Sequence, residues 1–436
     1  MTDPIADWTK THFTSEVVPA LDGKKVTLMG WLRDVRLHGN LAFLVLADRT
    51  GDAQVTVLKK NAPSAFEKLS EITRESAIAV KGTVKKTDKT QRGVEVILED
   101  LKLLNKSKTP LPLEVNEKVL AELDTRLDAR VLDLRKPRIS AIFKIRAQVL
   151  KSARDYLTEN KFLEIETPKM IASATEGGTE LFPIKYFEKK AFLRQSPQLY
   201  KELMVSCFEK VFEIGQVFRA EPSDTTQHLS EVTQLDIEMG FATEKDTWDV
   251  FDGILKRIYG DVAKNCAKEL ETLGVKFQQP KKVIVKTYTE ILKELEKKGF
   301  KLKWGEDIPP EGERLICDIH KEPVVVSEMP MEQKPFYIHQ HEKDPKLSYG
   351  FDLIFEGMEL ASGGRRIHDP EMYIAGLKAK GLNPKDFESV IKFYRYGMPP
   401  HAGWAIGIDR LVMVMCGLNN VREAVLFPRD AKRLTP

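Results

Sequence analysis

Two runs of alternating apolar and polar residues, joined by a polar loop, constrain the fold of this chain most strongly. The runs are EKVFEIGQVFRAE and EVTQLDIEMGF, and the loop between them is PSDTTQHLS. Strict alternation is typical of a strand with one buried face, so the pattern predicts two strands that face each other. Arg219 and Glu221 alternate with Phe218 and Ala220, so they share one face of their strand. On these residues alone, a surface ion pair is favoured over a ligand site.

The length of 436 residues exceeds the size of one ordinary core, so we expect two or more domains. A hydrophobic content of 42% with 31% charged residues is typical of a globular protein. The net charge of +3 permits a nucleic-acid partner without requiring one. The four cysteines form no CxxC pair, and we find neither a signal peptide nor a run of about 20 apolar residues. We therefore expect a cytoplasmic protein with no membrane partner.

The chain changes character near residue 106. Residues 24–104 contain five short β-rich segments, separated by turn signals such as HGN, RTGD and QRG. Five such strands with one helix-like piece, SAFEKLSEI, predict an OB-fold β-barrel over residues 1–106, a fold that commonly binds oligonucleotides. A linker or hinge follows over 107–136. Irregularly alternating strands and helices then predict an α+β domain over 137–436, an antiparallel sheet flanked by helices with an insert at about 274–345.

Familiar motifs of nucleotide and hydrolytic enzymes are missing from the sequence. Neither GxxxxGK[ST] nor a GxGxxG after a strand occurs, and HExxH and GxSxG are absent too. His339 and His341 form an HxH pair that could ligate a metal, but no third ligand is apparent, so a surface loop is favoured. Acyl-enzyme and Rossmann redox chemistry therefore have no support.

Several other polar residues stand where a ligand could bind. Gln198 and Lys201 are three apart at a predicted helix start and face the same way, so this lysine can hold an anion. Asp352 and Glu359 occupy strand-like positions, and Mg²⁺ takes one or two carboxylates together with substrate phosphates. Arg410 begins an apolar helix and needs an anionic partner, such as a nucleotide phosphate. The alternative for Lys201 is an exposed helix side chain. The alternative for the two carboxylates is a solvated hairpin, and the alternative for Arg410 is a structural salt bridge.

Taken together, these segments resemble the class II aminoacyl-tRNA synthetases. FLEIETP, with Pro168, looks like the first motif of that family, which builds a dimer interface. VFRAE with HLSEVTQLDIEMGF looks like the second motif, and GIDRL with Arg410 looks like the third. The N-terminal OB-like barrel places the chain in the subgroup that charges Asp, Asn or Lys. Within that subgroup, TEGGTELFP, QSPQLYKE, ASGGRR and FPRDAKRLTP are similar to the archaeal-type aspartyl-tRNA synthetases.

The resemblance implies an aspartate–tRNA ligase that forms a homodimer. Such an enzyme activates L-aspartate with ATP and Mg²⁺ to aspartyl-adenylate, and then transfers aspartate to the 3′ end of tRNA(Asp). Whether tRNA(Asn) is also a substrate stays open. Arg219 and Arg410 would be catalytic, with Arg219 bridging the aspartate α-carboxylate and the ATP α-phosphate.

The resemblance also implies three sets of binding residues. The residues implied to hold aspartate are Glu176, Gln198, Lys201, Arg219, Asp236, Ser362 and Arg366. The residues implied to hold ATP are Arg219, Glu221, Gln227, His228, Leu229, Glu359, Gly407 and Arg410. The Mg²⁺ site would consist of Asp352, Glu359 and Ser362.

Electrostatics agree with aspartate as the substrate. Lys201 and Arg366 would form a cationic pocket, in which a neutral asparagine leaves two buried charges unpaired and a lysine is repelled. Glu176, beside two glycines of a mobile loop, and Asp236 would meet the substrate ammonium. No general base or covalent nucleophile is required, because the α-carboxylate attacks the α-phosphorus in line. Catalysis is then positioning plus neutralisation of charge.

The barrel would read the tRNA anticodon. Phe43 and Gln54 match family positions for this task, by stacking on a base and by bonding a base edge; a core Phe and a solvated Gln are the alternatives. Arg33 and Gln91 lie where relatives that discriminate between tRNA(Asp) and tRNA(Asn) differ, and they match neither pattern. Pro222 also departs from the usual residue after Glu221 and should stiffen the loop entrance.

Three alternatives belong to different functional classes. An asparaginyl-tRNA synthetase is the first. A tRNA-independent asparagine synthetase of the same fold is the second, and the N-terminal barrel argues against it. An RNA-binding or regulatory paralogue without catalysis is the third, and the presence of Arg219, Glu359 and Arg410 argues against it.

Overall fold

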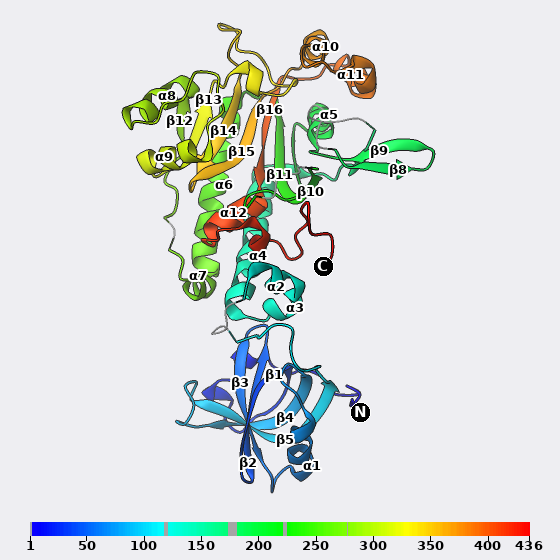
Figure 1. The fold of residues 1–436 in the computed structure, drawn as a ribbon, viewed down its shortest axis with the longest axis vertical. Helices are drawn as coiled ribbons and strands as arrows, with labels where there is room; N and C mark the ends of the chain where they lie inside the picture. Colours follow the sequence, from blue (N-terminus) through cyan, green and yellow to red (C-terminus); the bar gives the residue numbers. More distant parts are fainter. Residues whose placement is uncertain (1, 117–120, 173–180, 221–224, 277) are drawn as a thin grey trace. The chain divides into compact units, whose positions relative to one another are not determined.

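The computed structural model describes residues 2–116, 121–172, 181–220, 225–276 and 278–436 (Figure 1). The chain divides into two compact units, Met1–Pro137 and Arg138–Pro436. The first unit has one buried hydrophobic cluster of its own, and two further clusters lie in the second unit. Within the described ranges, no helix has the length and apolar character needed to cross a membrane.

A closed five-stranded barrel forms the first unit, and this confirms the predicted OB fold (Figure 1). Hydrogen-bonded neighbours follow the order β1–β2–β3–β5–β4. The barrel closes through antiparallel pairing of β1 with β4 and parallel pairing of β3 with β5. The elements of this unit are β1 (Lys25–His38), β2 (Leu41–Asp48), β3 (Gly51–Leu58), α1 (Pro63–Lys68), β4 (Ala77–Lys86), β5 (Val94–Asn105), α2 (Leu123–Asp128) and α3 (Arg130–Asp133).

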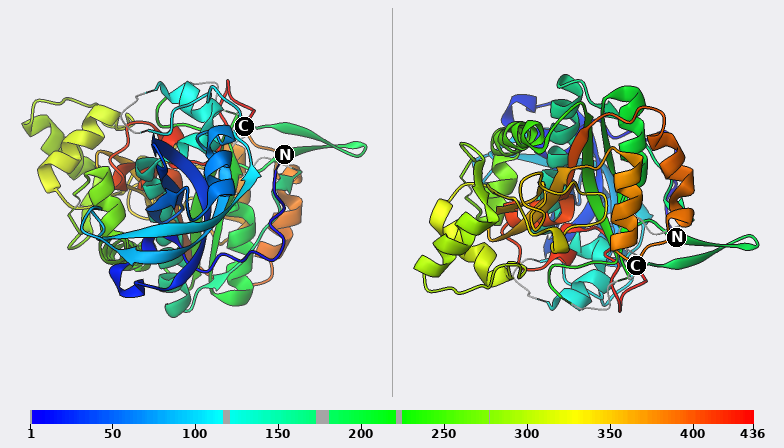
Figure 2. Two further views of the ribbon diagram at one scale, coloured as in Figure 1. Left: turned by 90° about the horizontal axis from the view of Figure 1, so that it is seen from below. Right: turned by 90° about the horizontal axis from the view of Figure 1, so that it is seen from above.

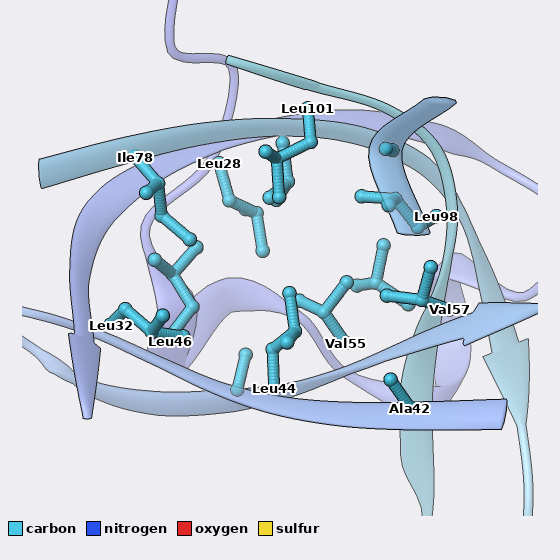
Figure 3. Packing of buried hydrophobic residues seen from close by; sticks show 14 of the residues in the cluster. Leu28, Leu32, Ala42, Leu44, Leu46, Val55, Val57, Ile78, Leu98 and Leu101 are labelled. Carbon is cyan, nitrogen blue, oxygen red and sulfur yellow. The ribbon is translucent and has the colours of Figure 1, made fainter. Parts of the chain in front are cut away.

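Alternation along β2 separates the inside of the barrel from its outer face. Ala42, Leu44 and Leu46 are fully buried and point into the core that Figure 3 shows. Phe43 and Val45, which alternate with them, are only half-buried. Because successive strand residues point to opposite faces, Phe43 belongs to the outer face rather than to the core.

An eight-stranded sheet organises the second unit, in the order β12–β13–β14–β15–β16–β11–β10–β6. Its pairs are antiparallel except for β10 with β6 and β12 with β13, so the predicted antiparallel-rich α+β fold is confirmed. The two alternating runs contain β10 and β11, which pair from Lys210 with Met239 to Phe218 with Glu231. The strands are β6 (Leu163–Glu164), β10 (Lys210–Phe218), β11 (Glu231–Gly240), β12 (Ile284–Thr287), β13 (Val324–Ser327), β14 (Gly350–Phe355), β15 (Met358–Arg365) and β16 (His401–Gly407).

Helices flank this sheet. Helix α6 packs against β15 and β16, and α12 packs against β11 and β16. In the right-hand view of Figure 2, the yellow-green α8 and α9 and the orange α10 and α11 lie at opposite ends of the sheet. The helices are α4 (Pro137–Glu159), α5 (Gln198–Phe208), α6 (Glu244–Asn265), α7 (Ala267–Leu273), α8 (Tyr288–Lys297), α9 (Pro310–His320), α10 (Pro370–Ala379), α11 (Glu388–Tyr394) and α12 (Ile408–Met415).

The segment over residues 274–345 continues the sheet rather than standing apart from it. Its strands β12 and β13 extend the edge beyond β14, and α8 and α9 pack on them around a buried cluster of their own. A separate three-stranded sheet, in the order β7–β9–β8, projects from the other side (Figure 1). Its strands are β7 (Met170–Ile171), β8 (Pro183–Tyr186) and β9 (Lys189–Leu193).

A buried carboxylate fixes the N-terminal segment to the barrel. Asp48, at the end of β2, accepts hydrogen bonds from Lys10 Nζ (2.6 Å), from the Thr14 backbone (2.9 Å) and from the Thr50 hydroxyl (2.7 Å). Burial alone would raise the pKa of Asp48, but the bonds from Lys10, Thr50 and Thr14 hold that pKa well below its ordinary 3.8. The carboxylate is therefore ionised wherever the barrel is folded at neutral pH.

Replacing Asp48 with Asn should destabilise the barrel in a pH-dependent way. Because the folded pKa is depressed, the charge contributes its full stability above the ordinary pKa of 3.8 and loses it as the pH falls further. Thermal melts of the full chain should therefore show the largest difference between wild type and Asp48→Asn near neutral pH. The difference should shrink steadily in acid. A difference that grows as the pH falls would contradict this account.

Candidate active site

A cavity of about 310 Å³ lies in the second unit, lined by residues of β11, β15 and β16 and of the starts of α5 and α12. Most of the predicted ligand-binding residues meet at this cavity. Those that line it are Gln198, Arg219, Gln227, His228, Leu229, Asp236, Glu359, Ser362, Arg366, Gly407 and Arg410. Lys201 and Asp352 lie behind its wall, bonded to the lining residues Asp236 and Lys334. Glu176 and Glu221 fall outside the described residues, as does Pro222.

One buried carboxylate connects the two cations that were predicted to select aspartate. Lys201 Nζ lies 3.1 Å from Asp236 Oδ1 and 3.4 Å from Glu238 Oε2. Arg366 makes a bidentate interaction with the same Glu238, in which Nε donates to Oε1 (3.0 Å) and Nη2 donates to Oε2 (3.3 Å). All four residues are at most 2% exposed. The predicted cationic pocket is therefore an ion cluster with equal numbers of both signs.

The cluster is held by elements that are distant in sequence. Asp236 and Glu238 are two apart on β11 and so project from the same face. Lys201 comes from α5, and Arg366 follows the end of β15. Burial raises the pKa of Asp236, and the Lys201 charge and hydrogen bond oppose that rise.

A second buried carboxylate, Glu202, lies behind the end of the cavity that Gln198 lines. It accepts hydrogen bonds from Gln198 Nε2 and from the Tyr394 hydroxyl. His401 Nε2 lies 3.8 Å from Glu202 Oε2. Burial alone would raise the pKa of Glu202, but His401, the nearby Arg366 charge and Tyr394 hold that pKa below its ordinary value. Glu202 is therefore ionised at neutral pH.

Arg410 and Arg219 form the other end of the cavity. Arg410, in α12, donates from Nε to the Gln227 carbonyl (3.4 Å), from Nη1 to the Glu359 carbonyl (3.2 Å) and from Nη2 to His228 Nε2 (3.4 Å). Arg219 follows β10 directly, and its backbone N–H donates to the Ser230 carbonyl (2.9 Å), which continues the strand pairing. Apart from Glu221, which is outside the described residues, the predicted ATP residues therefore line one cavity together.

The carboxylates predicted to bind Mg²⁺ lie on β14 and β15. Asp352 pairs across the strands with Ser362, and Glu359 stands near the start of β15. Burial and the neighbouring Asp352 raise the pKa of Glu359 to about 8, because two carboxylates share a poorly hydrated place. Among the described residues, no three His, Cys, Asp or Glu side chains are grouped to hold a metal. Two carboxylates and a hydroxyl nevertheless fit Mg²⁺, which completes its shell with phosphates and water.

Lys334 and Glu313, both in the segment over 274–345, belong to this region and were not foreseen. Lys334 Nζ lies 2.6 and 2.7 Å from the two Asp352 oxygens, and it lines the cavity. Glu313 accepts a bond from the Glu359 backbone N–H (3.2 Å). A neighbouring cavity of about 390 Å³ lies between Glu313 and Arg410 and extends the room available for a nucleotide. No sequence pattern marked either residue.

On the barrel, the predicted anticodon residues share the outer face of two strands. Phe43 pairs with Thr56, and Val45 pairs with Gln54, so Phe43 and Gln54 are diagonal neighbours. Gln54 Nε2 donates to Glu95 Oε2 (3.3 Å). The ring of Phe43 is half-buried and meets His38 edge-on at 6.2 Å between centroids.

The two residues predicted to influence the choice of tRNA differ in exposure and in bonding. Arg33 forms an ion pair with the buried Glu75 and donates from Nη2 to the Arg135 carbonyl (2.9 Å). Arg135 Nη1 also pairs with Glu75, at 2.8 Å. Gln91 is exposed in the turn between β4 and β5. Gln91 can therefore meet a partner as it stands, whereas Arg33 is already bonded within its own unit.

Comparison with known proteins defines the class to which this fold and site belong. A family model described as "tRNA synthetases class II (D, K and N)" matches residues 122–431, and one described as "OB-fold nucleic acid binding domain" matches residues 26–104. The chain belongs to the class II tRNA synthetases of this D, K and N group. It therefore belongs among the ligases that form aminoacyl-tRNA.

Named relatives narrow the similarity further. The chain is 46% identical over 435 residues to "Aspartate--tRNA(Asp/Asn) ligase" of Methanococcus maripaludis, covering 99% of both chains. It is 49% identical over 427 residues to the protein of the same name from Archaeoglobus fulgidus, covering 97% of this chain and 99% of the other.

Two solved structures resemble the whole chain. Asparaginyl-tRNA synthetase of Pyrococcus horikoshii, complexed with asparaginyl-adenylate, has a TM-score of 0.92 at 33% identity, covering 98% of this chain and 100% of the other. Aspartyl tRNA synthetase of Entamoeba histolytica has a TM-score of 0.88 at 30% identity, covering 100% and 94%. The fold is therefore shared with synthetases that are named for different amino acids.

Strands β16 and β11 lie so close together beside the ion cluster that position 403 requires a glycine. Gly403 of β16 pairs with Glu238, and a Cβ there would collide with the Ile237 carbonyl and the Glu238 carboxylate. Gly403→Ala should therefore lower the free energy of unfolding by ~1–3 kcal/mol, the usual cost of overpacking. Chemical denaturation of the full chain measures this.

Gly260 provides a control of opposite sign. It lies within α6, and a Cβ there would meet only Gln279 Nε2 at 4.0 Å. Gly260→Ala should leave stability unchanged or raise it by ~1 kcal/mol, because alanine favours a helix. Equal effects of the two substitutions would show that the contact at Gly403 does not constrain the sheet.

Proposed function

We propose that this chain is an aspartate–tRNA ligase, which activates L-aspartate with ATP and transfers it to tRNA(Asp). The observation that carries the proposal is Arg366, a buried guanidinium that lines the cavity. Its Nε and Nη2 bond to Glu238, and Nη1 has no partner among the described residues. The relatives named "Aspartate--tRNA(Asp/Asn) ligase" support the same substrate and extend the proposal to tRNA(Asn).

The ion cluster changes how we propose that the two predicted cations select aspartate. Lys201 and Arg366 would not stand unpaired beside asparagine, because Asp236 and Glu238 already neutralise both. Lys201 Nζ donates to Asp236 and to the Trp404 carbonyl, and it lies 3.4 Å from Glu238 Oε2. We therefore propose that Arg366 contacts the substrate carboxylate directly, and that Lys201 acts mainly by holding Asp236 and Glu238 in place.

Selectivity for aspartate then depends on the kind of hydrogen bond that Arg366 can make. A substrate carboxylate accepts a charge-assisted bond from Nη1, and such bonds are roughly twice as strong as neutral ones. The amide of asparagine offers only a neutral oxygen, and its NH₂ group faces a guanidinium that cannot accept. Asparagine is therefore bound more weakly without any steric exclusion.

Adenylate formation needs positioning and neutralisation of charge rather than a catalytic base. The substrate α-carboxylate attacks the α-phosphorus of ATP, and pyrophosphate leaves. Arg219 neutralises charge on the α-carboxylate and the α-phosphate, while Arg410 and His228 hold the nucleotide in its bent form. Asp352, Glu359 and Ser362 would hold Mg²⁺, which when bound supplies neutralisation of the phosphate charge.

The remaining partners follow from surface residues. Phe43 and Gln54 on the outer barrel face would contact the anticodon, by stacking and by bonding a base edge. A homodimer would form through the first-motif segment, where Leu163 and Met170 are 46% and 53% exposed. The four free cysteines fit a reducing cytoplasm.

The alternative function is that of an asparaginyl-tRNA synthetase. The similarity to the Pyrococcus horikoshii structure is the observation that favours it. Exchange of pyrophosphate into ATP, measured with L-aspartate and L-asparagine separately, distinguishes the two. We expect exchange with aspartate and at least about tenfold less with asparagine, the effect of losing one charged hydrogen bond. Exchange driven only by asparagine would contradict the proposal.

Arg219→Ala provides the control for that assay. Its loss should abolish exchange with aspartate, because Arg219 is the residue proposed to bridge the two substrates. Undiminished exchange in Arg219→Ala would show that the site has been assigned wrongly, even if aspartate is the substrate.

Phe43→Ala tests the role of the barrel separately. Loss of a stacking ring costs ~1–3 kcal/mol per base, so the KM for tRNA(Asp) should rise about tenfold or more. Pyrophosphate exchange, which needs no tRNA in this scheme, should stay unchanged. An unchanged KM for tRNA would show that Phe43 does not contact the anticodon.

A further inference from the structure

Glu202 occupies an unusual place beside the amino-acid end of the cavity. It follows Lys201 in α5 and is completely buried, yet it does not line the cavity. One of its oxygens accepts from Gln198 Nε2, and the other accepts from the Tyr394 hydroxyl. Both oxygens of this buried carboxylate thus accept hydrogen bonds, and one of the two donors, Gln198, lines the cavity.

The direction of these bonds determines which way the Gln198 amide points. An ionised carboxylate only accepts hydrogen bonds, so the group that meets Glu202 must be the NH₂ end of Gln198. Gln198 lines the cavity and is held at the start of its helix, where its backbone N–H donates to the Ser196 hydroxyl (3.3 Å). Its carbonyl oxygen is therefore the end that remains for a ligand.

Glu202 is itself held from two sides. Tyr394 reaches it from α11, and His401 approaches it from β16. The His401 ring is fixed by its Nδ1, which donates to the Pro399 carbonyl (2.8 Å). The His401 carbonyl accepts from the Arg366 backbone N–H (2.8 Å). Gln198 and Arg366 are therefore linked through Glu202 and His401.

We propose that Glu202 is a positioning residue for the amino-acid substrate, and that it locks the Gln198 carbonyl toward the cavity to receive the substrate α-ammonium together with Asp236. This inference rests on the proposed function. The chemistry of the cavity supports the choice of the ammonium: Gln198 and Asp236 present acceptors, whereas Arg219 and Arg366 present donors suited to the two carboxylates. A flipped amide would instead turn its NH₂ group toward the ammonium and repel it.

Succinate isolates the role of the ammonium, because it has the two carboxylates of aspartate and no amino group. Binding of L-aspartate and of succinate is measured by calorimetric titration of the full chain. In Glu202→Leu, which removes the acceptor, the affinity for aspartate should fall about tenfold relative to succinate. In Glu202→Gln, whose amide can accept or donate, the fall should be smaller, about threefold, since Gln198 is then only partly oriented.

Glu244→Gln is the matched control. Glu244 is also buried, and it pairs with Arg365 Nε at 2.8 Å away from the cavity lining. This variant loses a buried charge of the same kind, and its ratio of aspartate to succinate affinity should stay that of wild type.

Proportional loss of both ligands in Glu202→Leu would overturn the inference, because a purely structural role weakens the whole cavity. An unchanged ratio in either Glu202 variant would overturn it as well, and Glu202→Gln carries the test if the leucine variant does not fold. A wild-type chain that binds neither ligand would contradict the proposed function itself. A wild-type chain that binds both equally would contradict only the role of the ammonium acceptors.

Discussion

The bonds of Glu238 to both Lys201 and Arg366 are the interaction on which the rest of the catalytic unit depends. A buried carboxylate without partners would be costly, and so would either cation. Together with Asp236 the four groups neutralise one another. Removing one member leaves an uncompensated buried charge, so the loss of any one of the four residues is expected to destabilise this unit.

This cluster also explains the arrangement of the surrounding elements. Helix α5 must begin where Lys201 can reach β11, and β15 must end where Arg366 can reach the same strand. Strand β16 passes so close to Glu238 that only glycine fits at position 403. The cavity lies beside these contacts, and its chemical character follows from the two cluster residues that line it. Arg366 contributes a donor, and Asp236 contributes an acceptor.

Much of this architecture could be predicted from sequence, because it rests on periodicity. Alternation in the first hundred residues predicted the barrel, and the two alternating runs predicted β10 and β11 as partners. Motifs in four separate segments of the sequence predicted most of the ligand-binding residues that line the cavity. Alternation also held a signal for Glu238, since it is two residues after Asp236 and must share its face.

The remaining features depend on contacts between residues far apart in the chain. Lys334 looks like an ordinary lysine until β14 brings Asp352 beside it. Glu202 looks like an exposed helix residue until α11 and β16 cover it. Lys201 was predicted as a ligand of aspartate, but residue spacing gave no sign that two carboxylates of β11 lie 3.1 and 3.4 Å from its ammonium group. Long-range pairing of charges is the part of a site that residue spacing does not reveal.

Direct titration of L-aspartate and L-asparagine into the full chain tests the central claim, that the charge arrangement around Arg366 selects an anionic side chain. The account predicts that aspartate binds about tenfold more tightly or better, and that Arg366→Met abolishes this preference. Equal affinity of the wild-type chain for the two amino acids would contradict it.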